Sequence, residues 1–230
     1  MDVPGIVAAA ARNNAQWCAA MWASHLLPVE QLHGMLLTRA SPPPFYPNAV
    51  TIEASGAAEQ VAFLAGVAGG SAAFAVKDSF GVLQLEAFGF SPLFHGRWLW
   101  RRWEQADETD LAWRRVTSAA VLQQWEESWN DGAADPVKLF RPVLLDNPGV
   151  VLLAGYDERD RIVGGGVAFV ASGVLGMTNV FGNDRDFCSA AVRETGINLL
   201  VRYETGPLLR AALDEGFCDV GPMLVWGYAP

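Results

Sequence analysis

Residues 199–226 constrain the fold of this chain more than any other segment, because they indicate three consecutive elements. The first five residues are an apolar run, as is typical of a strand. Thr205 precedes a stripe of leucines and alanines at helical spacing, and it can cap a helix whose first turn accepts Pro207. Gly216 stands where such a helix would end, and a second apolar run follows. We therefore expect a strand, a capped helix and another strand.

A similar order of residues occurs earlier, in residues 74–100. The sequence VKDSFG at 76–81 resembles VRYETG at 201–206, and each is followed by a glycine–phenylalanine pair and a strand that carries tryptophan. This similarity predicts an internal duplication, with a capped helix in the earlier segment as in the later one. Chance similarity is the alternative, because short amphipathic strand–helix–strand patterns are common.

The second half of the chain indicates a regular series of elements. A helix is expected near residues 118–132, and three strands follow at 150–156, 162–170 and 174–181. Two short polar turns join these strands, which predicts an antiparallel meander. A helix from about Ser189 and the strand–helix–strand described first complete the order α–β–β–β–α–β–α–β.

The most polar window of the sequence is EQADETD, at residues 104–110, and we interpret it as a linker. It would separate an N-terminal unit, residues 1–103, from a C-terminal unit, residues 111–230. On the duplication hypothesis, the first unit is a trimmed copy of the second.

Composition excludes several classes of function. The net charge is −9 and no basic cluster is longer than two residues, which argues against binding to nucleic acid. No segment approaches the ~20 apolar residues of a membrane span. The N-terminus lacks the basic flank and apolar run of a signal peptide, so we expect a cytoplasmic protein.

The sequence also lacks the motifs of metal sites, disulfide frameworks and dinucleotide-binding sites. The three cysteines are far apart, and the three histidines show no metal-ligand spacing, so we expect neither a disulfide framework nor a metal site. The glycines at 164–166 lie inside a predicted strand and open no helix, unlike a dinucleotide-binding fingerprint.

The predicted order of elements resembles the GCN5-related N-acetyltransferase (GNAT) fold. The resemblance is carried by VVLLAGYDERDRIVGGGVAFV at 150–170, TNVF at 178–181 and ETGPLLRAALDEGF at 204–217. It covers a whole unit at 111–230. It implies an α/β (α+β) protein of two GNAT-like units, the second complete and the first trimmed, with a mixed central sheet and flanking helices.

The resemblance also implies an activity, that of an acyl-CoA-dependent N-acyltransferase acting on a small amine or an amino-acid-like acceptor. Acetyl-CoA or another acyl-CoA would be the cofactor, admitted where the fifth strand of the fold splays away from the fourth. Many members deprotonate the amine through a carboxylate or an ordered water and protonate the thiolate with a tyrosine, roles that match Glu204 and Tyr203. The implied cofactor contacts are Asn179, Val180, Phe181, Gly182 and Asn183.

The loop that binds the cofactor pyrophosphate in this family departs from its pattern here. The family pattern is Q/R-x-x-G-x-G/A, whereas residues 182–191 read GNDRDFCSAA, with one glycine and with Asp184 and Asp186 on either side of Arg185. Carboxylates beside a pyrophosphate raise the free energy of binding by like-charge repulsion. The alternative function is therefore a catalytically inactive GNAT-like module that binds a small ligand or a protein partner. The number of subunits is left open.

Each candidate residue also has a structural interpretation. Tyr203 could pack with its hydroxyl at the rim, and Glu204 could favour the start of a helix through the helix dipole. Asn179, in the middle of a strand, could face a cleft or be buried and bonded to backbone. Lys77 and Asp78 hold the matching positions in the earlier segment, where a salt-bridged rim is the simplest interpretation.

Overall fold

The computed structural model describes residues 1–67, 70, 72–104 and 110–229. Contacts within the chain define two compact units, one of Met1–Trp100 with Tyr203–Pro230 and the other of Arg101–Arg202. This division differs from the expected units 1–103 and 111–230, because the last strand pairs with strands of the first hundred residues. Most of the expected linker, residues 105–109, lies outside the described residues. The internal duplication stays a prediction.

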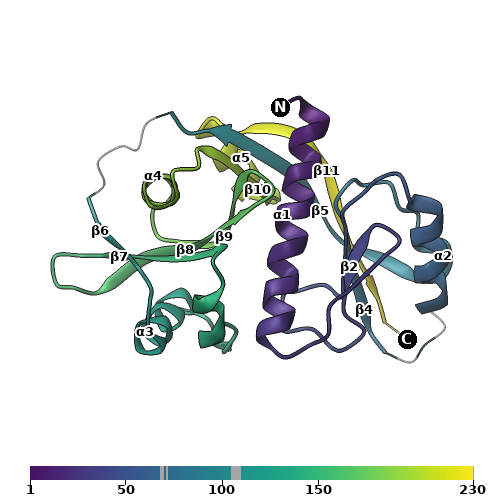
Figure 1. Ribbon diagram of the computed structural model, residues 1–230, viewed down its shortest axis with the longest axis horizontal. Helices are drawn as coiled ribbons and strands as arrows, with labels where there is room; N and C mark the ends of the chain where they lie inside the picture. The colour runs from purple at the N-terminus through teal and green to yellow at the C-terminus, as the bar shows by residue number, and fades with distance from the viewer. Residues whose placement is uncertain (68–69, 71, 105–109, 230) are drawn as a thin grey trace. The chain divides into compact units, whose positions relative to one another are not determined.

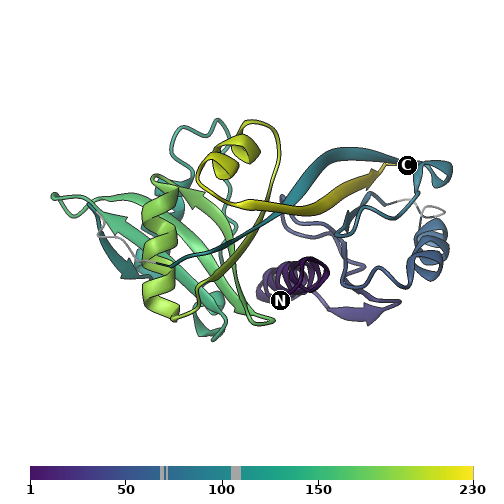
Figure 2. The ribbon, with the colours of Figure 1, turned by 90° about the horizontal axis from the view of Figure 1, so that it is seen from above.

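The first unit contains a mixed sheet in which β11 lies between β4 and β5. Only β3 and β4 pair in parallel there, and the other described pairs are antiparallel. Figure 2 shows the long β5 and β11 running side by side. In sheet order the strands are β1 (Glu30–Leu32), β2 (Met35–Leu37), β3 (Ala49–Thr51), β4 (Phe74–Asp78), β11 (Cys218–Tyr228) and β5 (Phe90–Arg102).

Two helices cover this sheet on opposite faces. Helix α1 (Val3–Ser24) begins at Asp2, whose carboxylate accepts the N–H of Gly5 at 3.0 Å. Apolar residues of α1 form a cluster with Val50 of β3. Ala49, the preceding residue of β3, belongs to a second cluster, which includes Leu64 of α2 (Ala57–Val67). Alternate residues of a strand point to opposite faces, so the two clusters lie on either side of the sheet.

The capped helix expected in the earlier segment is absent, and this prediction is wrong. Residues 79–85 form a loop, and only the 3-10 turn η1 (Glu86–Phe88) follows it. The Asp78 carboxylate accepts the N–H groups of Phe80, Gly81 and Leu83 at 3.2, 2.9 and 2.8 Å. These bonds fold the backbone back on the end of β4. The N–H groups that take part in them are therefore not available for the first turn of a helix.

The second unit is built on the predicted meander, which is confirmed. Strands β7, β8 and β9 pair antiparallel in sequence, β6 flanks β7, and β10 pairs with β9 in parallel. In sheet order the strands are β10 (Leu199–Glu204), β9 (Val174–Phe181), β8 (Ile162–Ala171), β7 (Val150–Tyr156) and β6 (Ala112–Arg115).

The glycines of β8 allow helices to approach this sheet closely from both sides. A Cβ atom on Gly165 would lie 2.6 Å from the Phe181 ring and would also meet Trp125 of α3 (Ala119–Trp129). A Cβ atom on Gly166 would lie 2.7 Å from the ring of Phe187 in α4 (Asp184–Thr195). Consecutive strand residues face opposite ways, so α3 and α4 cover opposite faces, as Figure 1 shows.

The predicted order of elements is confirmed from α3 to β11, with two local differences, whereas the strand β6 that precedes α3 was not predicted. Helix α4 begins at Asp184 rather than near Ser189. Thr205 does precede α5 (Gly206–Asp214), but its side chain makes no capping hydrogen bond. Gly216 ends that helix with φ 90°, as predicted. The chain also forms a 3-10 turn, η2, at Pro142–Asp146.

Within the described ranges, no helix has both the length and the apolar character needed to cross a membrane.

Candidate functional site

Strands β9 and β10 pair over only a short distance. Their parallel register joins Leu200 to Leu175 and Val201 to Gly176, although β9 continues to Phe181 and β10 to Glu204. The first four residues of β9 are buried and the last four are half-buried. The two strands therefore part after Gly176, and the last five residues of β9 form an edge with no strand paired on that side in the described structure.

A bulge marks the open part of β9. Gly165 pairs with Phe181 and Val167 with Thr178, so β9 contains one residue more than β8 between these pairs. Asn179 lies in the bulge with φ 54°, and its Oδ1 accepts the Thr178 hydroxyl at 3.0 Å. The alternative of a buried Asn179 is excluded, because its side chain is half-buried and bonds to a neighbouring hydroxyl. The bulge redirects backbone groups of the strand at its open edge.

The predicted cofactor residues that follow β9 form the start of a helix. Gly182 adopts φ 77°, and a Cβ atom there would lie 2.7 Å from both the Val163 carbonyl oxygen and the Gly164 Cα. Asn183 is the N-cap of α4, and its Oδ1 accepts the N–H groups of Arg185 and Asp186 at 3.1 and 3.3 Å. Two of the N–H groups that a helix start can offer to an anion are thus already bonded.

Charges of both signs surround this helix start. Arg202, near the end of β10, forms an ion pair with Asp184, and its side chain is only 9% exposed. Burial, followed by the nearby charge of Asp110, raises the pKa of Asp186 above its usual value, although Arg185 acts in the opposite direction. The carboxylates stabilise α4 through the helix dipole, but they oppose a phosphate at the same place.

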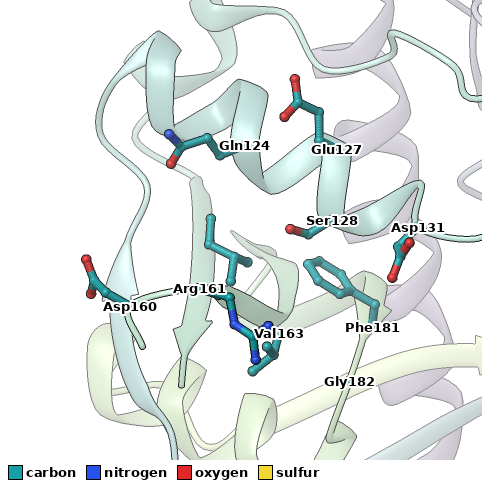
Figure 3. Close-up of a pocket in the computed structure, with 10 residues that line it drawn as sticks. Gln124, Glu127, Ser128, Asp131, Asp160, Arg161, Val163, Phe181 and Gly182 are labelled. Carbon is teal, nitrogen blue, oxygen red and sulfur yellow. The ribbon is translucent and has the colours of Figure 1, made fainter. Parts of the chain in front are cut away.

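A polar pocket of about 750 Å³ adjoins Phe181 and Gly182 in the second unit (Figure 3). Glu127 and Asp131 contribute carboxylates to its wall from α3 and the turn after it. Its cation, Arg161, is already held by Asp157 at 2.6 Å. The wall therefore carries net negative charge, which suits a polar or cationic group better than a phosphate. The pocket is lined by Gln124, Glu127, Ser128, Asp131, Asp160, Arg161, Ile162, Val163, Phe181 and Gly182.

Tyr203 and Glu204 are the last two residues of β10 and belong to the first unit. The Tyr203 ring packs edge-on against Trp98, with 5.6 Å between centroids, and lies nearly parallel to Phe94 at 6.5 Å. Both Tyr203 and Glu204 are half-buried. Aromatic neighbours on two sides hold the phenol in one orientation while part of the residue remains accessible.

Lys77 and Asp78 are buried, and the predicted salt-bridged rim is wrong. Lys77 is 4% exposed and Asp78 is fully buried. The Lys77 ammonium lies 4.2 Å from the Tyr203 ring centroid and donates to Asn14 Oδ1 at 2.9 Å. Asp78 instead bonds the loop backbone, and burial raises the pKa of its carboxyl, against the lowering effect of these bonds. Successive residues of β4 place the two charges on opposite faces, where they cannot pair.

Two features of these sites escaped the sequence interpretation. Asn183 followed by two aspartates in the next three residues is the signature of a helix start, and it could have placed α4 correctly. Lys77 is one of only two lysines in the chain and lies in an apolar strand, which could have marked it as buried. Its contacts with Asn14 and Tyr203 join residues more than sixty positions apart, and no local pattern predicts them.

Comparison with known proteins gives matches of structure alone. No model of a protein family matches the sequence, and no curated protein matches it. A GCN5-related N-acetyltransferase from Kribbella flavida has a TM-score of 0.56 and 13% identity, with 96% of each chain covered. A functionally unknown conserved protein from Staphylococcus epidermidis has a TM-score of 0.57 and 8% identity, with 86% of this chain and 92% of that chain covered.

A third similar structure is the N-myristoyltransferase of Saccharomyces cerevisiae with bound myristoyl-CoA and inhibitors. Its TM-score is 0.51 and its identity 7%, with 68% of this chain and 52% of that chain covered. Likeness at such low identity shows the fold. The chain thus has the predicted GNAT fold, a mixed α+β architecture with a central mixed sheet and flanking helices.

Proposed function

We propose that this protein is an acyl-CoA-dependent N-acyltransferase that acts on a small amine. The observation that carries the proposal is the open edge of β9 beyond Gly176, with the bulge at Asn179. An edge strand offers unpaired N–H and C=O groups to an extended ligand. The pantetheine arm of an acyl-CoA is extended and contains two amide groups, so it can add to this edge as a strand would.

The acyl group would reach the strand at the bulge. A backbone N–H redirected by a bulge can donate to the thioester carbonyl oxygen, where negative charge develops as the amine attacks. Asn179, Val180, Phe181 and Gly182 would then line the path of the cofactor, and Asn183 would stand at the phosphate end. Acetyl-CoA or a longer acyl-CoA is the cofactor on this proposal.

Tyr203 and Glu204 would transfer the protons. The amine attacks the thioester carbon, the C–S bond breaks, and the thiolate takes a proton from the Tyr203 phenol. Glu204, directly or through a water, accepts the proton that the nitrogen loses, and this proton restores the phenol in the next cycle. The half-buried position of both residues supports these roles.

A second candidate function is favoured by the start of α4. Asn183 already occupies two N–H groups there, and Asp184 and Asp186 add negative charge. A GNAT-shaped module that no longer acylates, and that binds a small ligand or a protein partner, would have no need of a phosphate cradle. The two functions make opposite predictions for acyl-CoA binding.

Calorimetric titration with acetyl-CoA distinguishes them. On the acyltransferase proposal we expect saturable binding in the micromolar range, strengthened by added salt because salt screens the repulsion between the diphosphate and the carboxylates of Asp184 and Asp186. Free CoA should bind as well, since the pantetheine and nucleotide are shared. No heat of binding at millimolar acetyl-CoA, at either salt concentration, would contradict the proposal and favour the inactive module.

Replacing Asp186 with asparagine should strengthen acetyl-CoA binding about two- to fivefold, because one like charge near the diphosphate is worth roughly 0.2–1 kcal/mol. The advantage should vanish as the pH falls through the raised pKa of Asp186, since the wild-type carboxyl is then neutral too. Calorimetry at two pH values measures both effects. Asp214→Asn, an exposed change at the far end of α5, is the control for net charge. Equal affinity of Asp186→Asn and wild type at neutral pH would place the diphosphate elsewhere.

A further inference from the structure

Lys77 is a buried cation without a buried anion. Its residue is 4% exposed, and its Nζ bonds Asn14 Oδ1 at 2.9 Å. Among the described residues no carboxylate forms an ion pair with it. An ammonium removed from water is costly unless a partner charge and hydrogen bonds replace the solvent. The charge at this position therefore requires a function or a partner.

Among the described residues, the side chains in contact with the ammonium carry no charge in their ordinary state. Helix α1 contributes the Asn14 amide, whose oxygen also accepts from the Cys18 thiol, and β10 contributes the Tyr203 ring. Burial raises the pKa of the Cys18 thiol, which keeps it protonated. Asp78, the next residue of β4, is turned to the other face and bonded to the loop. The part of the chain that the structure describes thus supplies dipoles and an aromatic face here, but no negative charge.

The ammonium retains donor capacity. It has three N–H groups, of which Asn14 accepts one, and the Tyr203 side chain can take at most one more. Asn14 and Tyr203, which contact the ammonium, are themselves half-buried. Burial acts to lower the pKa of Lys77, whereas Tyr203 and Cys18 act in the opposite direction and raise it overall.

We propose that Lys77 binds a carboxylate of the acceptor, so that the substrates are amines that also carry a carboxylate, such as amino acids. This inference rests on the proposed function, in which Tyr203 and Glu204 transfer protons at the acceptor nitrogen. Lys77 contacts Tyr203 directly, and Glu204 is the next residue of β10. An amine that attacks beside the Tyr203 phenol would bring a carboxylate on the adjacent carbon toward Nζ, which lies 4.2 Å from the centre of that ring.

The overall charge of the protein makes such a local cation necessary. The chain carries a net charge of −9, which repels anionic ligands. A buried ammonium attracts a carboxylate more strongly than an exposed one, because water screens it less. Lys77 would accordingly discriminate between an amino acid and the corresponding amide, which has the same shape without the charge.

The composition of the chain allows a direct test by nuclear magnetic resonance. Lys77 and Lys138 are its only lysines, so the protein labelled with ¹³C-lysine gives two Cε signals, assigned with Lys138→Arg. Alanine, acetate and alaninamide are titrated into the full chain. We expect alanine and acetate to shift the Lys77 signal saturably, and alaninamide and the exposed Lys138 to show no such response. The proposal is overturned if the Lys77 signal does not shift with alanine or acetate at 100-fold molar excess over the protein. It is also overturned if the Lys77 and Lys138 signals shift together.

Acylation kinetics give the second test. With alanine as acceptor, Lys77→Met should raise KM about 10- to 100-fold, as expected for loss of a hydrogen bond between charged groups, and Lys77→Arg should recover part of it. With alaninamide the same variants should raise KM much less, so the ratio of the two KM values isolates the effect of the carboxylate from any effect on Tyr203. Lys138→Met is the control, and thermal unfolding confirms that Lys77→Met is folded. Equal losses with alanine and alaninamide would refute carboxylate binding. Acylation of neither amine, with the Lys77 signal still responding to carboxylates, would reject the acyltransferase function and retain the anion site.

Discussion

Replacing Tyr203 with phenylalanine should lower kcat about 10²- to 10⁴-fold, the usual contribution of a positioned proton donor. The change removes only the hydroxyl. The ring keeps its contacts with Trp98 and Phe94 and its face toward the Lys77 ammonium, so the fold and the affinity for acyl-CoA should change little. Steady-state kinetics with saturating acetyl-CoA, together with calorimetry and thermal unfolding, separate these effects.

A matched control for this variant is Tyr228→Phe. Tyr228 lies at the end of β11, is half-buried and packs on Phe90 with 5.4 Å between centroids, so it loses the same atom from a similar aromatic contact. We expect the kcat of Tyr228→Phe to equal that of wild type. Unchanged kcat in Tyr203→Phe would exclude Tyr203 as the acid. A loss in Tyr203→Phe that coincides with lost acetyl-CoA affinity would instead assign the phenol to binding.

Replacing Trp125 with alanine should lower the free energy of unfolding by about 3–5 kcal/mol. The side chain is fully buried between α3 and the sheet, and its ring packs edge-on against Phe140 and Phe181 at 5.0 and 5.4 Å. Its Nε1 donates to the Leu153 carbonyl at 2.9 Å. The truncation leaves a large cavity over β8, where glycine offers no side chain to fill it.

Urea denaturation measures this loss, and Trp129→Ala is the control. Trp129 lies one turn further along α3, is half-buried and contacts Phe140 at 5.4 Å, so its removal should cost distinctly less. Trp125→Ala should also loosen Phe181, because the two rings touch, and acetyl-CoA affinity should fall with stability. Equal destabilisation by the two variants would contradict the assignment of Trp125 as the central packing residue of this unit.

The sequence by itself determined the order of the elements from α3 to β11. Apolar runs separated by polar turns specified the meander β7–β8–β9, and Gly216 specified the end of α5, because these signals depend on residues only a few positions apart. The GNAT resemblance followed from that order and is confirmed as the fold. The similarity of residues 74–100 to the later segment predicted a helix that does not form. Hydrogen bonds from the backbone to the Asp78 carboxylate stabilise a loop there instead.

Only the tertiary structure decided the features on which function depends. Where β10 leaves β9 and where the bulge forms are set by pairing between strands, which periodicity does not encode. The burial of Lys77 beside Asn14 and Tyr203 brings together residues from α1, β4 and β10. Short-range preferences fix the elements of this protein, whereas packing between distant residues fixes its charges and its open strand edge, because burial and strand pairing exist only once the chain has folded.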